Sequence, residues 1–472
     1  MAATVTEHLL PIGGARVETG SWIDVKSPYS GDVIARVASG GTTEARRAVD
    51  AAATALQAPL PAHERARVLD AVAALLRERA DEAARTISAE AGKPMKAARV
   101  EASRAISTYT FAAVEARKLA GDVVPMDASP AGEGKLAFTL RLPIGLVGAI
   151  SPFNFPLNLV AHKIAPALAA GCPVVIKPAG ATPLSALLLA ELAEEAGLPP
   201  GWLNVVAGPA GPIGDELVGD ERVKLITFTG SGAVGWGLAE RAHRKRVKLE
   251  LGNATPAIVC ADAPDGTAAK LAANAFSYAG QSCISVQRIF IADDAWDGFV
   301  DAFVPAVEAL RVGDPADEET DVGPLITPDE RQRVLDWVRE SKGEVLTGGE
   351  LTGDGLLTPA VIAGPAPSDR VQCEEVFGPV VTLTRVDTID EAIGLANATR
   401  YGLQAAIFSR DLKTCLDAAS RLEFGGVTIN EAPTFRADQM PYGGVKASGN
   451  TKEGPAWTVR EMTEERLVVI DL

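Results

Sequence analysis

Leu146-Val-Gly-Ala-Ile-Ser151 and Leu225-Ile-Thr-Phe-Thr229 enclose the stretch of sequence that decides the fold. Between them, short apolar runs of strand type alternate with longer runs of helix type. The alternating segments are Leu146 to Ser151, Ala161 to Ala170, Val174 to Lys177, Leu184 to Ala196, Leu203 to Ala207 and Leu225 to Thr229. Strands and helices that alternate at this spacing predict an α/β fold with a parallel sheet of the doubly wound type.

The same alternation of strand-type and helix-type runs extends outward from this stretch. A second alternating region runs from Ala257 to about Phe435, and Glu465-Arg-Leu-Val-Val-Ile-Asp471 has the pattern of a further strand. Upstream, two alternating runs between Trp22 and Val37 flank a turn and predict a hairpin. Helices are predicted over Thr42 to Leu56, His63 to Ala91 and Met95 to Leu119. At 472 residues the chain exceeds one hydrophobic core, so two or three domains are expected.

A second hairpin is predicted between Val123 and Leu142, where two strand-like runs flank the turn-rich Asp127-Ala-Ser-Pro-Ala-Gly-Glu-Gly134. It interrupts the boundary between the helical and the α/β regions. Such a hairpin either mediates a subunit contact or forms a surface flap, and its pattern does not separate the two.

Composition excludes several classes of function. A formal net charge of −16 argues against a nucleic-acid partner and against an anionic membrane surface. The five Cys residues have no CxxC spacing and the chain holds only four His, which argues against bound metal and a disulfide framework. The longest uncharged run, Leu142 to His162, is interrupted by prolines and is not a membrane span. The start of the chain does not resemble a signal peptide, so a cytoplasmic protein is expected.

Two strand-to-helix loops are suited to a dinucleotide. Lys177 ends the apolar run Val174-Val-Ile-Lys177, at the edge where parallel sheets bind ligands. Gly230 and Ser231 follow the run that ends at Thr229 and precede a helix, whose N-terminus favours a phosphate. Neither loop has the GxGxxG pattern, and each alone is also compatible with a structural turn.

Cys283 lies in Tyr278-Ala-Gly-Gln-Ser-Cys-Ile-Ser-Val-Gln-Arg288, just before an apolar run of strand type. Glu250 ends another such run, in Lys248-Leu-Glu-Leu-Gly-Asn253. A thiol and a separate carboxylate suit covalent catalysis, in which a thiolate attacks a carbonyl and a base later activates water. A buried structural cysteine is the alternative on this window alone.

Taken together, the motifs resemble the aldehyde dehydrogenase superfamily over almost the whole chain. They occur in the family's order: Ser151-Pro-Phe-Asn154-Phe-Pro, Lys177-Pro178, Phe228-Thr-Gly-Ser231, Glu250-Leu-Gly252, Gly280-Gln-Ser-Cys283, Glu374-Glu-Val-Phe377-Gly-Pro and Pro441-Tyr-Gly-Gly444-Val-Lys. The resemblance implies a Rossmann-like cofactor domain, an α/β catalytic domain and a small β oligomerisation flap. The cofactor domain is expected over 1–121 and 142–250, and the catalytic domain over 251–440. The oligomerisation segments are expected over 122–141 and 455–472, in a homodimer or homotetramer.

The resemblance also assigns roles. Cys283 is similar to the nucleophile, Glu250 to the general base, and Asn154 to the residue whose amide forms the oxyanion hole with the Cys283 backbone amide. Residues similar to those that bind NAD or NADP are Lys177 at the adenosine ribose, Gly230 and Ser231 at the pyrophosphate, Glu375 at the nicotinamide ribose and Phe377 beside the nicotinamide. Gly180 replaces a Glu that many NAD-preferring members use for the ribose 2′-hydroxyl, so NADP becomes acceptable or preferred.

The form of the cysteine motif resembles a subgroup near the non-phosphorylating glyceraldehyde-3-phosphate, lactaldehyde, phosphonoacetaldehyde and succinate-semialdehyde dehydrogenases. Many of these oxidise small polar or anionic aldehydes. Arg104 and Arg436 are candidates to bind an anionic group, because guanidinium suits carboxylate or phosphate; a salt bridge is the alternative for each. Two other functions stay open: a coenzyme A-acylating enzyme, which generally lacks the equivalent of Glu250, and a non-catalytic homologue with a binding or structural role.

Overall fold

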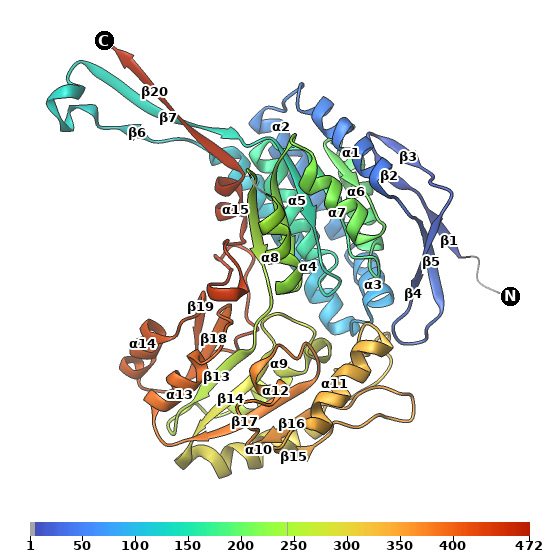
Figure 1. Cartoon of the computed structure of the whole chain (residues 1–472), viewed down its shortest axis with the longest axis vertical. Coiled ribbons are helices and arrows are strands. Elements are labelled where there is room, and N and C mark those ends of the chain that lie inside the picture. Colours follow the sequence, from blue (N-terminus) through green and yellow to red (C-terminus); the bar gives the residue numbers. More distant parts are fainter. Residues whose placement is uncertain (1–4, 243) are drawn as a thin grey trace.

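The computed structural model describes residues 5–242 and 244–472. Its first large sheet has five parallel strands in the order β10-β9-β8-β11-β12 (Figure 1). The strands are β8 (Leu146–Ile150), β9 (Val174–Lys177), β10 (Leu203–Val205), β11 (Val223–Thr229) and β12 (Arg246–Glu250). The helices that connect them are α5 (Asn158–Ala170), α6 (Leu184–Glu195), α7 (Ala210–Gly219) and α8 (Gly232–Arg241). The strand order reverses between β8 and β11, so right-handed crossovers send α5 and α6 to one face and α8 to the other.

This doubly wound sheet confirms the alternation predicted from the sequence, with one omission. Helix α7 was not among the predicted segments. Its sequence, Ala-Gly-Pro-Ile-Gly-Asp-Glu-Leu-Val-Gly, is rich in residues that disfavour helix interiors. Proline is tolerated in a first helical turn, and Ile213 and Leu217 bury one face of the helix. Tertiary packing therefore outweighs the weak local propensity.

Four further helices cover this sheet: α1 (Thr42–Ala55), α2 (Ala62–Glu78), α3 (Ala80–Ala91) and α4 (Met95–Lys118). The prediction of a single helix over His63 to Ala91 was wrong, because the backbone leaves the helical region at Arg79. Arg79 binds Glu82 at the start of α3 and Glu191 on α6, so its side chain fixes this corner against α6. Helix α4 packs against α2, α3 and α5.

The N-terminal strands form two small sheets. One has the order β1-β5-β4 and the other pairs β2 with β3. Their bounds are β1 (Thr6–His8), β2 (Leu10–Ile12), β3 (Ala15–Val17), β4 (Trp22–Lys26) and β5 (Val33–Ala38). The antiparallel β4–β5 pair is the hairpin predicted around Trp22 to Val37.

The second large sheet has seven strands in the order β15-β16-β17-β14-β13-β18-β19, all parallel except the edge strand β15. The strands are β13 (Thr255–Val259), β14 (Val286–Ala292), β15 (Glu344–Thr347), β16 (Ala360–Ala363), β17 (Val380–Val386), β18 (Gln404–Phe408) and β19 (Gly426–Ile429). Its helices are α9 (Thr267–Ala275), α10 (Trp296–Glu308), α11 (Pro328–Glu340), α12 (Arg370–Cys373), α13 (Ile389–Asn397) and α14 (Leu412–Arg421). Short 3₁₀ turns are η3 (Ser277–Gly280), η4 (Asp293–Ala295) and η5 (Lys446–Ser448).

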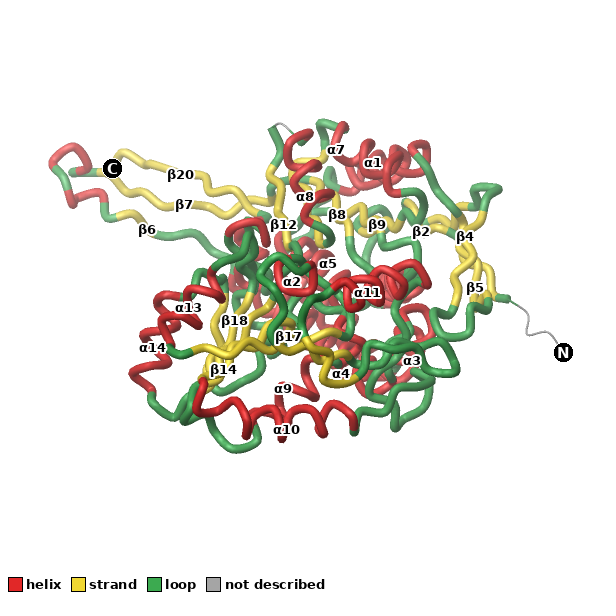
Figure 2. Tube along the Cα trace, turned by 60° about the horizontal axis from the view of Figure 1, so that its bottom comes forward, coloured by secondary structure: helices red, strands yellow, loops and turns green. Residues whose placement is uncertain are grey.

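A three-stranded antiparallel arm, in the order β20-β7-β6, projects from the body of the molecule (Figures 1 and 2). Its strands are β6 (Val123–Val124), β7 (Lys135–Pro143) and β20 (Thr463–Asp471), with η1 (Met126–Ala128) and η2 (Pro130–Gly132) at the tip; helix α15 (Pro455–Glu461) leads into β20. The predicted hairpin is the β6–β7 pair, and the tail strand β20 pairs with β7 along its whole length.

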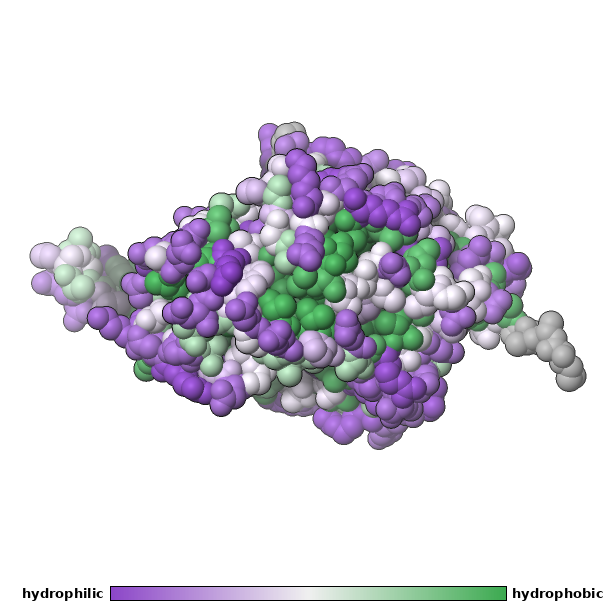
Figure 3. All heavy atoms as spheres, turned by 90° about the horizontal axis from the view of Figure 1, so that it is seen from below, coloured by the Kyte–Doolittle hydropathy of each residue, from purple (hydrophilic) through white to green (hydrophobic). Residues whose placement is uncertain are grey.

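Apolar side chains fill one core around the first sheet and two cores on the faces of the second. Seen from below, a group of apolar residues lies in the middle of the surface and hydrophilic residues surround it (Figure 3). None of the helices within residues 5–242 and 244–472 is long and apolar enough to cross a membrane.

Candidate active site

Four of the candidate residues lie at one edge of the first sheet. Asn154 follows β8, Lys177 ends β9, Ser231 follows β11 and Glu250 ends β12. Because these strands are parallel, their carboxyl ends meet at the same edge, where open α/β sheets bind ligands. Parallel pairing therefore brings together residues that are far apart in the sequence.

Three further candidates come from the amino ends of two neighbouring strands in the second sheet. Cys283 lies between η3 and β14, whereas Glu375 and Phe377 lie between α12 and β17. The Asn154 amide donates to the Gln281 carbonyl at 3.0 Å, just before Cys283. The carboxyl edge of one sheet thus faces the amino edge of the other across the site.

The chain before Cys283 has a constrained backbone. Tyr278, Ala279 and Gly280 have φ values of 51°, 52° and 71°, in the left-handed region. A β-carbon on Gly280 would lie 2.1 Å from the Gly378 carbonyl oxygen, so only glycine fits there. This close approach holds the Cys283 loop against the loop of Phe377, whose own φ is 49°.

The Cys283 thiol is half-buried, and its sulfur lies 2.8 Å from the Tyr442 hydroxyl oxygen. Burial raises the pKa of Cys283 to about 12. The hydrogen bond with Tyr442 and the charge of Arg436 lower that pKa, whereas Glu375 and Glu250 raise it. The resting side chain is therefore a protonated thiol, and the groups around it decide how readily it ionises.

The Asn154 side chain is buried and held by its single donated bond to Gln281. Its amide nitrogen has a second hydrogen, and its Oδ1 has no hydrogen-bond partner among the described residues. A fixed amide beside the cysteine loop matches the requirement for an oxyanion donor, which must be oriented before charge develops.

The Glu250 carboxylate is buried, and neither of its oxygens has a hydrogen-bond partner in the described part of the chain. Burial raises its pKa well above the ordinary value, and Glu453 raises it further, whereas Arg436 and Lys163 oppose the shift. Such a carboxylate is a stronger base than an exposed one. Lys163 and Glu453 were missed in the sequence because they lie outside the motif residues to which roles were assigned.

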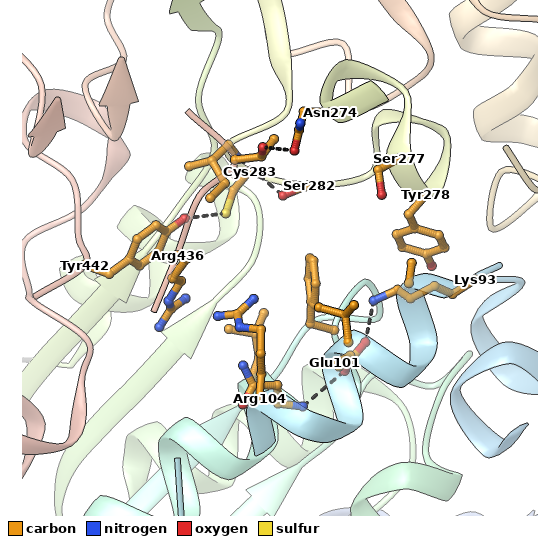
Figure 4. A pocket seen from close by; sticks show the side chains of 17 residues that line it. Lys93, Glu101, Arg104, Asn274, Ser277, Tyr278, Ser282, Cys283, Arg436 and Tyr442 are labelled. Atoms are coloured by element: carbon orange, nitrogen blue, oxygen red, sulfur yellow. Dashed lines mark hydrogen bonds and ion pairs between the residues drawn. The ribbon is translucent and has the colours of Figure 1, made fainter. Parts of the chain in front are cut away.

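One cavity of about 220 Å³ is lined by Cys283, Arg104 and Arg436 together. Figure 4 shows the two guanidinium groups facing the space beside Cys283, Arg104 from helix α4 and Arg436 from the chain after β19. Lys93, Glu101, Tyr278 and Tyr442 also line this cavity.

Each arginine of the cavity is also paired with a carboxylate. Arg104 donates to Asp438 through Nε and Nη2, at 3.4 and 3.0 Å. Arg436 donates through Nη2 to Glu453 at 2.8 Å, and its guanidinium lies 3.9 Å from the centre of the Tyr442 ring. Its Nε has no partner among the described residues. A salt bridge and the binding of an anionic substrate group are thus compatible, because each guanidinium retains donors for a second anion.

The candidate cofactor residues have unused hydrogen-bonding capacity that fits a dinucleotide. The buried Lys177 ammonium donates to the Pro178 carbonyl at 3.0 Å, which leaves further donors for ribose hydroxyls. Ser231 is the N-cap of α8, and its side chain makes no capping hydrogen bond. The N-terminus of this helix therefore remains available to a phosphate.

The remaining cofactor candidates lie in the loops that follow β11 and α12. A β-carbon on Gly230 would lie 2.7 Å from the Phe228 ring, so the turn needs glycine. Glu375 is half-buried, and its carboxylate accepts from the Asn253 backbone amide at 3.0 Å; burial raises its pKa to about 7. The Phe377 and Phe153 rings pack edge to face, with centroids 5.8 Å apart.

Comparison with known proteins places this geometry in a family. The model of the aldehyde dehydrogenase family matches residues 16–468. The chain is 42% identical to the 3-sulfolactaldehyde dehydrogenase of Priestia aryabhattai, over 99% of both chains. Aldehyde dehydrogenase 21 from Physcomitrella patens, solved with its reaction product succinate, superposes with a TM-score of 0.96 at 39% identity, over 99% of each chain. Glyceraldehyde-3-phosphate dehydrogenase from Methanocaldococcus jannaschii, complexed with NADP, gives 0.92 at 39% identity, over 97% of this chain and 100% of that one.

Proposed function

This chain belongs to the aldehyde dehydrogenase family, and we propose that it oxidises a small polar or anionic aldehyde to its carboxylic acid. The observation that carries the proposal is the single cavity that holds the Cys283 thiol and the guanidinium groups of Arg104 and Arg436. A nucleophile and two fixed cations in about 220 Å³ suit a short substrate with a carbonyl at one end and an anion at the other.

Cys283 is the proposed nucleophile. Its thiolate adds to the aldehyde carbon, and the carbonyl electron pair moves onto the oxygen to give a thiohemiacetal. The Asn154 side-chain amide and the Cys283 backbone amide donate to this oxygen. One such donor contributes about 3 kcal/mol to the stability of the transition state.

NAD or NADP, when bound, accepts the hydride that leaves the thiohemiacetal carbon. Lys177 and Ser231 would hold its adenosine ribose and pyrophosphate, Glu375 its nicotinamide ribose, and Phe377 would lie against the nicotinamide. Gly180 is exposed, and the space beside its α-carbon is open. Because Gly180 has no carboxylate to repel a 2′-phosphate, the position favours acceptance of NADP.

Glu250 completes the proposed cycle. As a carboxylate it takes a proton from water, and the resulting hydroxide attacks the carbonyl carbon of the thioester on Cys283. The C–S bond breaks, the carboxylic acid leaves and Cys283 departs as thiolate. The raised pKa of Glu250 makes it a competent base for this step.

The relatives support a small anionic substrate without fixing which one. One is named for 3-sulfolactaldehyde, and a solved neighbour holds succinate as its product. Both names describe short molecules that carry an anionic group away from the reacting carbon. We therefore propose that Arg104 and Arg436 bind a sulfonate, carboxylate or phosphate in this chain.

The proposal is tested with a panel of aldehydes and each cofactor in turn. The panel contains 3-sulfolactaldehyde, lactaldehyde, succinic semialdehyde and the neutral propionaldehyde, and reduced nicotinamide is followed by absorbance. We expect turnover without coenzyme A, a free acid as product and the highest kcat/KM for an anionic aldehyde. A strict requirement for coenzyme A would favour the acylating alternative, and the absence of turnover would favour a non-catalytic role.

The arginines are tested by Arg104→Leu and by the double variant Arg104→Leu/Arg436→Leu. KM for an anionic aldehyde should rise far more than KM for propionaldehyde, because only the anion loses a charged hydrogen-bond donor. An equal rise in KM for both substrates would contradict binding of the anionic group by the arginines. Arg36→Leu, at an exposed salt bridge with Asp24, is the matched control.

We also propose that the arm joins two copies of this chain. Its apolar residues Leu136, Leu140, Leu467, Val469 and Ile470 are each at least 40% exposed. An exposed group of this kind on paired strands favours a partner of the same shape. Light scattering of the intact chain should report a dimer or tetramer, and Leu467→Glu/Val469→Glu should lower the mass; a monomeric intact chain would contradict the proposal.

A further inference from the structure

The sulfur of Cys283 has a single hydrogen-bond partner among the described residues, the hydroxyl of Tyr442 at 2.8 Å. Figure 4 shows the two side chains pointing toward each other at one end of the cavity. Tyr442 itself is buried, and its hydroxyl makes no other hydrogen bond within residues 5–242 and 244–472. The phenol is thus directed at the atom that is proposed to react.

Two contacts hold Tyr442 in this place. Its backbone amide and carbonyl pair with those of Glu453, at 2.9 and 2.5 Å. Its ring packs under the Arg436 guanidinium, which is bound to the same Glu453 through its side chain. The main-chain pairing, the stacking on the ring and the salt bridge therefore connect Tyr442, Arg436 and Glu453 to one another. Together these contacts hold the hydroxyl beside Cys283.

The chemistry of the pair decides the direction of the hydrogen bond. Burial raises the pKa of Tyr442 well above its ordinary value, and the neighbouring Cys283 raises it further. The phenol therefore keeps its proton across the working pH range, whereas a thiolate has no proton to give. Once Cys283 ionises, Tyr442 is the donor and the sulfur is the acceptor.

The thiolate needs such a donor in this site. Burial, Glu375 and Glu250 all raise the pKa of Cys283, whereas Tyr442 and Arg436 lower it. Arg436 lies over the Tyr442 ring, so its positive charge also strengthens the O–H as a donor. The two groups that lower the pKa of Cys283 thus contact each other.

We propose that Tyr442 is a catalytic residue, whose hydroxyl donates to the Cys283 sulfur and stabilises the thiolate that attacks the aldehyde. The proposal rests on the proposed role of Cys283 as the nucleophile. The thiol proton leaves to solvent, and Tyr442 keeps its own proton throughout. The sulfur then forms the S–C bond while the carbonyl electron pair moves to the oxygen held by Asn154.

The test removes the hydroxyl and keeps the ring. In Tyr442→Phe, the rate at which iodoacetamide alkylates Cys283 is measured from pH 6 to pH 11 by mass spectrometry of the Cys283 peptide. The rate follows the thiolate fraction. Loss of a hydrogen bond to a charged acceptor corresponds to alkylation about 10- to 100-fold slower at each pH below the pKa of the thiol, pH 8 included.

Tyr109→Phe is the matched control. Tyr109 is a buried core residue whose hydroxyl has no partner in the described part of the chain, so its loss should leave the profile unchanged. A Tyr442→Phe profile that superposes on that of the unmodified protein would overturn the proposal. Circular dichroism and the thermal midpoint confirm that each variant is folded.

A second experiment needs no folded Tyr442→Phe variant. Replacement of the five tyrosines by 3-fluorotyrosine makes the phenol a stronger acid and a stronger donor. Alkylation of Cys283 at pH 8 should then be faster, and an unchanged or slower rate would contradict the hydrogen bond. Because alkylation requires no aldehyde, this result stands apart from the test of aldehyde oxidation, and either proposal can fail without the other.

Discussion

Gly252 and Glu375 lie so close together that a β-carbon on Gly252 would come within 2.0 Å of a Glu375 carboxylate oxygen. The same carboxylate accepts a hydrogen bond from the Asn253 backbone amide at 3.0 Å. Gly252 belongs to the segment between β12 and β13, just after Glu250, and Glu375 to the amino edge of the second sheet. The contact therefore joins the loop of the proposed base Glu250 to the proposed ligand of the nicotinamide ribose.

Gly252→Ala should displace the Glu375 side chain, because the atom it meets is the free end of a flexible residue. The lost hydrogen bonds to the cofactor ribose correspond to a rise in KM for the cofactor of about tenfold or more. Titration of protein fluorescence with the reduced cofactor measures the affinity directly. Unchanged affinity would show that Glu375 does not contribute, and Gly237→Ala, whose added carbon meets open space, is the control.

Glu250→Gln should separate the two halves of the reaction. The amide keeps the size of the side chain but cannot accept a proton from water, so the thioester on Cys283 should accumulate. We expect one burst of reduced nicotinamide per active site, followed by a steady rate about 100-fold or more below that of the unmodified protein. Mass spectrometry of the quenched protein should find the acyl group on Cys283; a normal steady rate would exclude Glu250 as the base.

The hydrolysis step should depend on pH with a definite sign. A base acts only when it is deprotonated, and the pKa of Glu250 is raised by burial and by Glu453. The rate of thioester hydrolysis should therefore increase as the pH rises through that raised pKa, above the range of an ordinary carboxylate. Single-turnover kinetics with the acyl enzyme measure this rate. A rate that is flat from pH 5 to pH 9 would contradict the assignment.

Gly180→Glu should shift the cofactor preference toward NAD. The position is exposed and open, so the new carboxylate fits without rearrangement and can accept from a ribose 2′-hydroxyl. It repels a 2′-phosphate instead, and the ratio of kcat/KM for NADP to that for NAD should fall by about tenfold or more. An unmodified protein that already favours NAD by tenfold would contradict the interpretation of Gly180.

Glu101→Gln should destabilise the fold. Glu101 forms a buried ion pair with Lys93 and also accepts from the Leu157 and Asn158 amides at the start of α5, at 2.9 and 3.1 Å. The variant leaves the Lys93 ammonium without its counter-ion, between the rings of Phe155 and Tyr278.

The expected cost of Glu101→Gln is about 3–5 kcal/mol, visible as a lower thermal midpoint in circular dichroism. Lys93→Met in the same chain should recover part of this loss, because it removes the unpaired charge. The exposed pair Arg85–Asp81 is the control, since Arg85→Ala should change the midpoint little. A Glu101→Gln midpoint as high as that of the control would contradict the prediction.

Local patterns in the sequence were sufficient for much of the fold. The apolar runs at β8, β9 and β11 are short, bounded by turns and separated by helix-type segments, so the doubly wound sheet could be predicted. Helix α7 and the break at Arg79 could not, because glycine-rich helices and helix corners are stabilised by packing against distant elements.

The motif residues were also accessible from the sequence, because Cys283, Glu250 and Asn154 each follow or precede a strand in a recognisable local setting. The long-range contacts of the site residues could not be predicted in this way. Arg104 meets Asp438, 334 residues away, and Tyr442 meets Cys283, 159 residues away. No local pattern encodes such pairs, because they depend on how the two sheets and helix α4 pack.

The sequence by itself thus determined the alternation of strands and helices, which depends on neighbours along the chain, and its motifs were sufficient to propose Cys283, Glu250 and Asn154 as nucleophile, base and oxyanion amide. Only the tertiary structure decided that two arginines share a cavity with the sulfur, that each keeps a carboxylate partner and that a phenol faces Cys283. The physical reason is that charge pairing, burial and hydrogen-bond direction depend on contacts between distant parts of the chain. These contacts form only when the carboxyl edge of one sheet faces the amino edge of the other.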